Sequence, residues 1–282
     1  MQKQYTINSL AFLRAGNKRD IEEQFSRSEL TFSCAANWIS YAHKFLMEGK
    51  PLNGTTDIFD CAFACQRQDF RDDKLLEKYK SNLIRIDIGD KKYYYFNPVI
   101  TMPAICFYTI NNNILEQYEV LKGRIIDFPL NEYAKVFDIR EAAFLLISDV
   151  ESFGEELRRE LPRSIIRQKE KFTSDGFTYK FDEKSPYIIG NILYEDRQKN
   201  PIFYNETDYL EPMFRKDCRY KWQNEVRIVV PNISFKHSFG ANYEKKCYKN
   251  NLLNVSLPCL HDYARIIHVT DKLIVRSEAI FI

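Results

Sequence analysis

The chain has 282 residues, of which 45% are hydrophobic and 28% charged, a composition typical of globular proteins and not of disordered or fibrous ones. Its 41 basic and 39 acidic residues give a net charge of +2, which creates no overall field that would indicate a nucleic-acid-binding protein. The sequence shows no apolar signal segment, no run that approaches the ~20 apolar residues of a membrane span, and seven cysteines without paired spacing. We therefore expect a cytoplasmic protein with reduced thiols and no membrane partner.

Hydrophobic periodicity predicts short strands and helices in the first part of the chain. Strands are expected over residues 8–16 and 30–33, and helices over 18–27, 37–48 and 57–66. Strict alternation over residues 84–88, a Gly89–Asp90 turn and the aromatic run 93–96 together predict a β-hairpin.

The second part of the chain continues with short strands and a single long helix. Strands are expected over residues 105–110, 143–148, 187–194, 265–269 and 273–281, the last two paired with each other, and a helix over 150–161 that Pro162 ends. Because strands and helices do not alternate as βαβ units, the pattern favours an α+β fold, with one domain over residues 1–282 and a mixed, largely antiparallel, split sheet flanked by helices. The basic stretch 162–186 is expected to be a mobile insertion with a solvated surface.

The most informative stretch of the chain begins at Arg219 and ends before Pro231. Its β-branched end, residues 226–230, predicts a strand, and side chains two apart in a strand share a face. Gln223, Glu225 and Arg227 are then expected in one row. Such a row is either the wall of a cleft or a solvated face, and on a solvated face a pair of Glu225 with Arg227 would contribute only about 0–1 kcal/mol.

Three groups of residues occur in an order that resembles the ADP-ribosyltransferase superfamily of the Arg–Ser–Glu type. Arg14 follows an apolar run, Thr31 and Ser33 flank Phe32 in the next strand, and Gln223-x-Glu225 opens the late strand. The family's middle motif is usually Ser-Thr-Ser, so the middle strand departs from the pattern, and Ser148 is an alternative for it. The chain is also similar to uncharacterised bacterial phage-defence proteins in one layout of residues: Lys216–Asp217, Tyr220, Gln223, Glu225 and Arg227.

This resemblance implies an NAD-dependent transferase that needs no metal. Glu225 would be the catalytic carboxylate that stabilises an oxocarbenium-like ribosyl transition state, and Gln223 would orient the acceptor. The remaining roles would be binding of the pyrophosphate by Arg14, bracing of the carboxylate by Thr31 or Ser33, and stacking on a flat ring by Tyr220 and Trp222. The implied partners are a macromolecular acceptor, protein or nucleic acid, and an antitoxin or phage protein, with a role as a toxin or anti-phage effector.

Two other function classes remain open at this stage. The same scaffold could carry a non-catalytic recognition or sensor protein, with its many Tyr and Phe side chains contacting a partner. A metal-dependent nuclease would need the acids near residues 57–73 as ligands, although such acids are ordinarily a helix cap and solvated side chains: Asp57, Asp60, Asp69, Asp72 and Asp73. Cys61 and Cys65 lack the second ligand pair that a zinc site requires.

Overall fold

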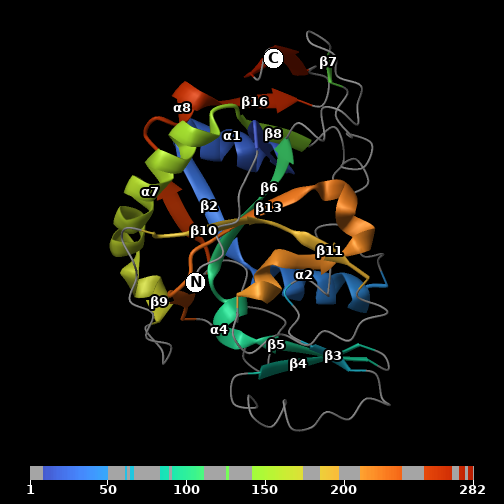
Figure 1. Cartoon of the computed structure of the whole chain (residues 1–282). Coiled ribbons are helices and arrows are strands. Elements are labelled where there is room, and N and C mark those ends of the chain that lie inside the picture. Colours follow the sequence, from blue (N-terminus) through green and yellow to red (C-terminus); the bar gives the residue numbers. More distant parts are fainter. Residues whose placement is uncertain are drawn as a thin grey trace.

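The computed structural model describes residues 9–49, 61, 64–66, 83–88, 91–110, 125–126, 142–173, 185–196, 210–236, 251–268, 273–276 and 279–281 (Figure 1). Within these ranges the strands pair mostly antiparallel and the helices follow no regular βαβ order, which confirms the predicted α+β class. Among the described residues, no helix combines the length and the apolar character that a membrane crossing requires.

The main sheet has the strand order β10–β13–β6–β1–β8–β16, and every neighbouring pair in it is antiparallel. Its strands are, in chain order, β1 (Ala11–Asn17), β6 (Pro103–Ile110), β8 (Ala142–Ile147), β10 (Ile188–Asn191), β13 (Glu225–Val229) and β16 (Ala264–His268). Every described residue of β8 is buried, because strands cover both of its edges and side chains cover both of its faces.

The sheet splits where β6 changes partners. β2 (Glu29–Cys34) pairs with β15 (Leu253–Ser256) and also joins the sheet through the beginning of β6. Residues 103–104 of β6 pair with β2, whereas residues 108–110 pair with β1, so 105–107 pair with neither strand on that edge. The predicted split sheet is therefore present, and the opening lies between β1 and β2.

Three helices cover the sheet: α1 (Lys18–Ser26), α2 (Ala35–Met47) and α7 (Val150–Arg167). Phe153 of α7 packs against Phe12 and Phe107 from two central strands, with ring centroids 6.2 and 5.8 Å apart. On the other side of β13, the Arg227 guanidinium lies over the ring of Trp38 from α2, with its Cζ 4.9 Å from the ring centroid. The two faces of the sheet therefore differ, because one is apolar and aromatic while the other receives buried charge.

The helix α7 is longer than the sequence predicts, because it continues through Pro162 to Arg167. Proline lacks a backbone N–H and disturbs the preceding turn, which is the reason to expect an end there. Tertiary packing overrides this cost, since Leu157, Leu161 and Ile165 form one buried stripe across the proline. The beginning of the expected insertion 162–186 is therefore regular structure: the end of α7, the 3-10 helix η2 (Lys169–Lys171) and strand β9 (Phe172–Thr173).

Small sheets complete the described structure. The predicted hairpin is confirmed as β4 (Leu83–Ile88) and β5 (Lys91–Phe96), and β5 also pairs with β3 (Ala64–Gln66). The expected helix 57–66 is wrong at this end, because residues 64–66 gain a ladder against β5, and its other residues except Cys61 lie outside the described ranges. The remaining elements are α4 (Asn97–Ile100), β7 (Ile125–Ile126), β11 (Leu193–Glu195), η3 (Glu211–Phe214), β12 (Arg215–Asp217), η4 (Cys218–Gln223), β14 (Ser234–Phe235), α8 (Leu260–Tyr263), β17 (Leu273–Arg276) and β18 (Ala279–Phe281).

Two strand predictions differ from the structure in their partners. The expected strand 187–194 is divided, because β10 pairs with β13 in the main sheet and β11 pairs in parallel with β12. The expected pairing of residues 265–269 with 273–281 is wrong: β16 completes the open edge of the buried strand β8, and β17 pairs with β18 and β7. Alternation in sequence identifies a strand, but it does not identify the neighbour.

Candidate functional site

The strand that contains Glu225 and Arg227 begins at Glu225, two residues later than the predicted row with Gln223 requires. Gln223 is the last residue of η4, Asn224 adopts a left-handed conformation with φ of 38°, and β13 starts at Glu225. Asp217 initiates η4 by accepting a hydrogen bond from the Arg219 amide at 3.0 Å, and asparagine tolerates the left-handed region better than most residues. The prediction that Gln223 belongs to the strand is therefore wrong, whereas the pair of Glu225 and Arg227 does share one face.

Glu225 is buried, with 6% of its surface exposed, and it lies between two cations. Its Oε1 accepts hydrogen bonds from Nε and Nη2 of Arg227 at 3.0 and 2.5 Å, and its Oε2 accepts one from Nζ of Lys216 at 3.0 Å. The Glu225 amide donates to the Tyr194 hydroxyl at 2.8 Å. Glu225 and Arg227 therefore do not lie on a solvated face, because the side chains of Lys216 and Arg227 are almost completely excluded from solvent.

Arg227 is fully buried and bonded on every side. Besides Glu225, its Nη1 donates to the Met213 carbonyl at 2.7 Å and contacts Sγ of Cys61 at 3.2 Å. A guanidinium can be this deeply buried only when its N–H groups find acceptors, since an uncompensated buried charge is very costly. The position of the Glu225 carboxylate is therefore fixed from below by a rigid cation.

The charges around Glu225 keep it ionised despite its burial. Burial alone would raise the pKa of this carboxyl, but Arg227 and Lys216, with hydrogen bonds from Cys106 and Lys216, lower the pKa well below its usual range. Burial raises the pKa of the neighbouring Tyr194 hydroxyl, and the Glu225 charge raises it further, so this phenol stays protonated. The site presents a permanent anion in a largely dry environment.

Cys106 is the partly exposed residue among the side chains that donate hydrogen bonds to the Glu225 carboxylate, since Lys216 and Arg227 are buried. It lies opposite Arg227 in the β6–β13 ladder, and it is the one partly exposed residue of β6, whose other residues are buried. Its thiol donates a hydrogen bond to Glu225 and also interacts electrostatically with Arg14. Cys106 belongs to the segment 105–107, which pairs with neither β1 nor β2, so the carboxylate has a partner at the point where the sheet splits.

Arg14 contacts α1 and β2 through hydrogen bonds of its guanidinium. Its Nη1 donates to Oε1 of Gln24 at 2.5 Å and its Nη2 to the Thr31 carbonyl at 3.3 Å, while the Thr31 amide donates to the same Gln24 oxygen at 3.2 Å. Arg14 and Gln24 thus satisfy backbone groups of β2 that have no ladder partner where β1 diverges. Burial lowers the pKa of Arg14 to about 10, so it remains charged at neutral pH.

Arg14 and Glu225 point to opposite faces of the main sheet, because side chains alternate between the two faces along a strand. Glu225 lies in one row with Tyr108 and Leu13, so Arg14, the next residue of β1, leaves the strand toward the opposite face. The structure brings Arg14 and Thr31 together, and it brings Glu225 and Arg227 together. Cys106 lies near both groups, because its thiol donates a hydrogen bond to Glu225 and it is within electrostatic range of Arg14.

The other residues of the predicted site lie around these two groups. Ser33 accepts a hydrogen bond from Nδ2 of Asn37 at 3.0 Å, and the carboxylate of Glu225 is braced by Lys216, Arg227 and Cys106 instead of by Ser33 or Thr31. The alternative Ser148 donates to the Tyr263 carbonyl at 3.1 Å, at the β8–β16 end of the sheet.

The aromatic residues and Gln223 lie on the segment that precedes β13. Tyr220 is buried, and its ring carries Nζ of Lys216 at 5.7 Å and the Arg219 guanidinium at 5.6 Å, whereas Trp222 is half-buried. Gln223 is 8% exposed, and its Oε1 has no hydrogen-bond partner among the described residues. The Oε1 atom of Gln223 therefore has bonding capacity to spare.

Sequence reasoning missed three contributors to the site: Cys106, Tyr194 and Gln24. Each acts through a contact between elements that are distant in sequence, so no local pattern marks them. Lys216 was named only as part of the resemblance to phage-defence proteins and was given no role. It lies nine residues before Glu225 and is the second cation that contacts this carboxylate. The one available signal was chemical, since a buried carboxylate with one arginine still has an oxygen that requires a donor.

The nuclease alternative has no support in the described structure. Its acids, Asp57, Asp60, Asp69, Asp72 and Asp73, all lie outside the described residues. Within the part of the chain that the structure describes, no group of three or more His, Cys, Asp or Glu side chains is arranged to hold a metal ion.

Comparison of the chain with protein-family models, with curated proteins and with solved structures found no match in any of the three.

Proposed function

We propose that the chain is an ADP-ribosyltransferase-like enzyme that cleaves the bond between nicotinamide and ribose of NAD and transfers ADP-ribose to a protein or nucleic acid. One observation carries this proposal. A permanently ionised carboxylate, Glu225, accepts a hydrogen bond from Cys106, the only partly exposed residue of β6, and the guanidinium of Arg14 lies within electrostatic range of the same cysteine. The residue order that resembles the superfamily is consistent with this arrangement.

The reaction needs an anion at a fixed position beside the sugar. The bond between C1′ of ribose and the nicotinamide nitrogen breaks, its electron pair stays on the nitrogen, and C1′ becomes oxocarbenium-like. A preorganised carboxylate in a site of low dielectric stabilises this charge far more than the same carboxylate does in water. The nucleophile of the acceptor then bonds to C1′ and releases its proton.

The hydrogen bonds of Glu225 indicate where the ribose would bind. A carboxylate offers about four lone-pair positions, and three of them accept N–H groups from Arg227 and Lys216. The fourth donor is the Cys106 thiol, which is the weakest donor of the set and belongs to the only donor residue that is not buried. A ribose hydroxyl is a stronger donor, so it would displace this thiol and leave the two cations in place.

The remaining residues supply binding and orientation. Arg14 uses two of its five N–H groups within the protein, so a bidentate contact to a pyrophosphate is open to it. Gln223, with its unpartnered Oε1 two residues before Glu225, would orient a donor group of the acceptor.

The test measures transfer of label from NAD that is radiolabelled in the adenylate phosphate, with purified protein and a bacterial lysate. Incorporation into protein or nucleic acid is expected for the wild type, and Glu225→Gln should reduce it at least about 100-fold, the usual scale for loss of a transition-state charge contact. Cys106→Ala should retain activity, because the thiol only occupies the position of the substrate. Transfer by Glu225→Gln at the wild-type rate would overturn the assignment.

A matched control variant tests whether loss of any carboxylate would have the same effect as loss of Glu225. Glu23→Gln removes a carboxylate from an exposed ion pair with Arg27 and should leave both transfer and stability unchanged. Arg14→Lys keeps the charge but removes the fork geometry, so it should raise the KM for NAD more than it lowers kcat. Toxicity of the expressed wild type, absent in Glu225→Gln, would support the further proposal of a cytoplasmic toxin or anti-phage effector.

A second candidate is a recognition or sensor protein without catalysis. It is favoured by one observation: both oxygens of Glu225 are already bonded within the protein, and only 6% of the residue is exposed. In that case no NAD is consumed, and the buried cluster only stabilises the fold. Detection of free nicotinamide from NAD by the wild type, and its loss in Glu225→Gln, would exclude this candidate.

A further inference from the structure

The last turns of α7 and the residues after it form a strongly basic part of the surface. Residues 158–171 contain six basic and two acidic residues, in a chain whose total net charge is +2. One of the two acids, Glu160, is buried, whereas Arg159, Arg163, Arg167 and Lys169 are exposed. The even balance of charge along the whole chain therefore conceals a local excess of positive charge.

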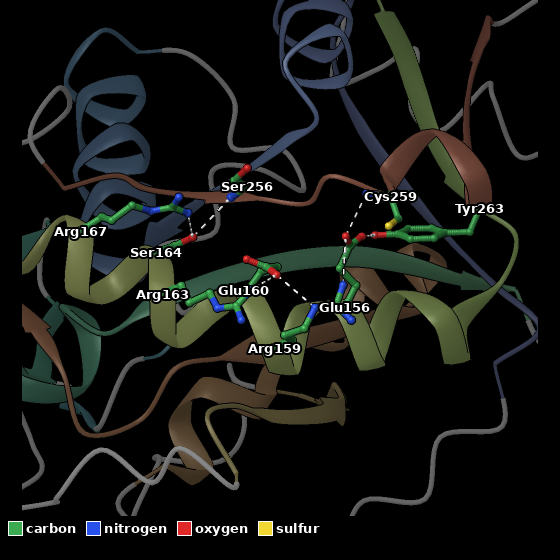
Figure 2. Close-up of polar contacts among 9 residues, drawn as sticks. All are labelled: Glu156, Arg159, Glu160, Arg163, Ser164, Arg167, Ser256, Cys259 and Tyr263. Atoms are coloured by element: carbon green, nitrogen blue, oxygen red, sulfur yellow. Dashed lines mark hydrogen bonds and ion pairs between the residues drawn. The ribbon is translucent and has the colours of Figure 1, made fainter.

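Three of these basic residues form a row that we call the arginine row: Arg159, Arg163 and Arg167 (Figure 2). They are four residues apart, so they lie on one side of α7 at intervals of about 6 Å and span about 12 Å. The side chains of Arg159 and Arg163 are 53% and 63% exposed, so more than half of each side chain contacts solvent.

Buried side chains hold the arginine row in place from beneath. A single oxygen of Glu160 accepts from Nε of Arg159 at 3.1 Å and from Nη1 of Arg163 at 2.8 Å, as Figure 2 shows. The Arg167 Nη2 donates to Oγ of Ser164, a fully buried residue, at 3.1 Å. Arg159 also forms an ion pair with the buried Glu156 at 3.5 Å. Two carboxylates therefore lie beneath three arginines, and the row keeps an excess of positive charge.

We propose that the arginine row, with Arg158 and Lys169 beside it, binds the phosphate backbone of a nucleic acid. Phosphates follow one another every ~3.4 Å along a strand, so a row of about 12 Å faces three to four of them. Arginine matches phosphate with a bidentate fork, and anchoring by Glu160 and Ser164 lowers the conformational entropy lost on binding. The contact is to the backbone, so it carries no sequence preference.

The charges at the two ends of the arginine row are consistent with binding of a polyanion. On its N-terminal side the arginine row ends at the exposed acids Glu151 and Glu155, which would repel phosphate. The basic character continues beyond the helix to Lys169, and Lys171 is held by Gln168 and by the Leu252 carbonyl. The proposal does not depend on NAD chemistry, since it concerns binding by a surface that is separate from Glu225.

The experiment measures fluorescence anisotropy of a labelled single-stranded oligonucleotide of mixed sequence, about 16 nucleotides long, titrated with the full-length protein at about 50 mM NaCl. Binding is expected, with log K falling linearly against log salt at a slope of about −2, the value for roughly three neutralised phosphates. The triple variant Arg159→Gln, Arg163→Gln and Arg167→Gln should lose at least about 30-fold in affinity and most of this slope.

A second triple variant controls for net charge. Arg27→Gln, Lys44→Gln and Arg85→Gln remove the same charge from exposed positions elsewhere and should change affinity less than about 3-fold. Both triple variants must keep the wild-type circular dichroism and melting temperature. Equal losses in the two variants would overturn the proposal, and so would binding to vesicles of anionic lipid without binding to the oligonucleotide. Either result leaves the NAD proposal untouched, because no turnover is measured.

Discussion

Two glutamates of this protein are each shared between two basic side chains, and they differ in where those bases lie. Glu225 joins Arg227 and Lys216, whose side chains are 0% and 4% exposed. Glu160 joins Arg159 and Arg163, whose side chains are 53% and 63% exposed. The hydrogen-bond distances are similar, at 2.5–3.0 Å for Glu225 and 2.8–3.1 Å for Glu160.

The comparison shows that solvent, and not geometry, decides what such a cluster does. Removing one partner of a buried cluster leaves an uncompensated charge in a medium that cannot solvate it, which costs about 3–5 kcal/mol. Removing Glu160 leaves two arginines that water solvates, and removing one arginine leaves Glu160 paired with the other, so the cost is about 0–1 kcal/mol. The first cluster is therefore suited to hold a permanent anion in a rigid site, and the second to exchange its solvent contacts for a ligand.

The largest expected effect is that of removing the deeply buried cation. Arg227→Met should lower the free energy of unfolding by about 3–5 kcal/mol, because Glu225 then faces only Lys216 and the Met213 carbonyl loses its donor. Urea denaturation followed by circular dichroism measures this change. The matched Arg163→Met should change the same quantity by less than about 1 kcal/mol, and equal losses in both variants would contradict the comparison.

The next effect is a dependence of stability on pH. The pKa of Glu225 in the folded protein lies below the unfolded value of about 4.3, so its stabilising contribution is complete above that value and is lost as the pH falls through the folded pKa. Glu225→Gln should cost about 3 kcal/mol at neutral pH, and this difference from wild type should narrow below about pH 4. Urea midpoints measured from neutral pH downward give the curve; a difference independent of pH would contradict it.

A smaller effect is expected from the corresponding change in the exposed cluster. Glu160→Gln should lower the free energy of unfolding by about 1 kcal/mol, because the glutamine still accepts a hydrogen bond and both arginines are already solvated. Thermal denaturation of this variant beside Glu225→Gln compares the two positions directly. A loss as large as that of Glu225→Gln would mean that Glu160 determines the stability of α7 and does not merely position the arginines.

The smallest effect is that of salt on the two clusters. At about 1 M NaCl the Debye length falls to about 3 Å, so the contribution of Glu160 and its arginines should nearly vanish, while that of Glu225 should persist. The difference between wild type and Glu160→Gln is expected to fall below about 0.5 kcal/mol at high salt. A comparable fall in the difference between wild type and Glu225→Gln would show that solvent reaches the buried cluster.

The sequence by itself determined the elements and the class of the fold. Alternation and 3.6-residue periodicity are local properties, so they located β1, α1, β2, α2 and the β4–β5 hairpin, and the lack of βαβ units gave the antiparallel α+β class. They also identified residues 219–230 as the most informative stretch of the chain and placed Glu225 and Arg227 on one face of its strand. The same local rules ended α7 at Pro162 and placed Gln223 in a strand, because they take no account of the buried stripe across the proline or of the left-handed Asn224.

Only the tertiary structure decided which residues meet. The partner change of β6 splits the sheet at residues 105–107, and the ladders beside it connect residues that are more than 90 positions apart in the chain, such as Leu13, Tyr108 and Glu225. The sequence also did not predict that Glu225 and Arg227 are buried, because the motif Gln-x-Glu-x-Arg can occur both on a solvated face and inside a protein. The physical reason is that solvation and long-range contact depend on the whole packed chain, whereas periodicity depends only on its neighbouring residues.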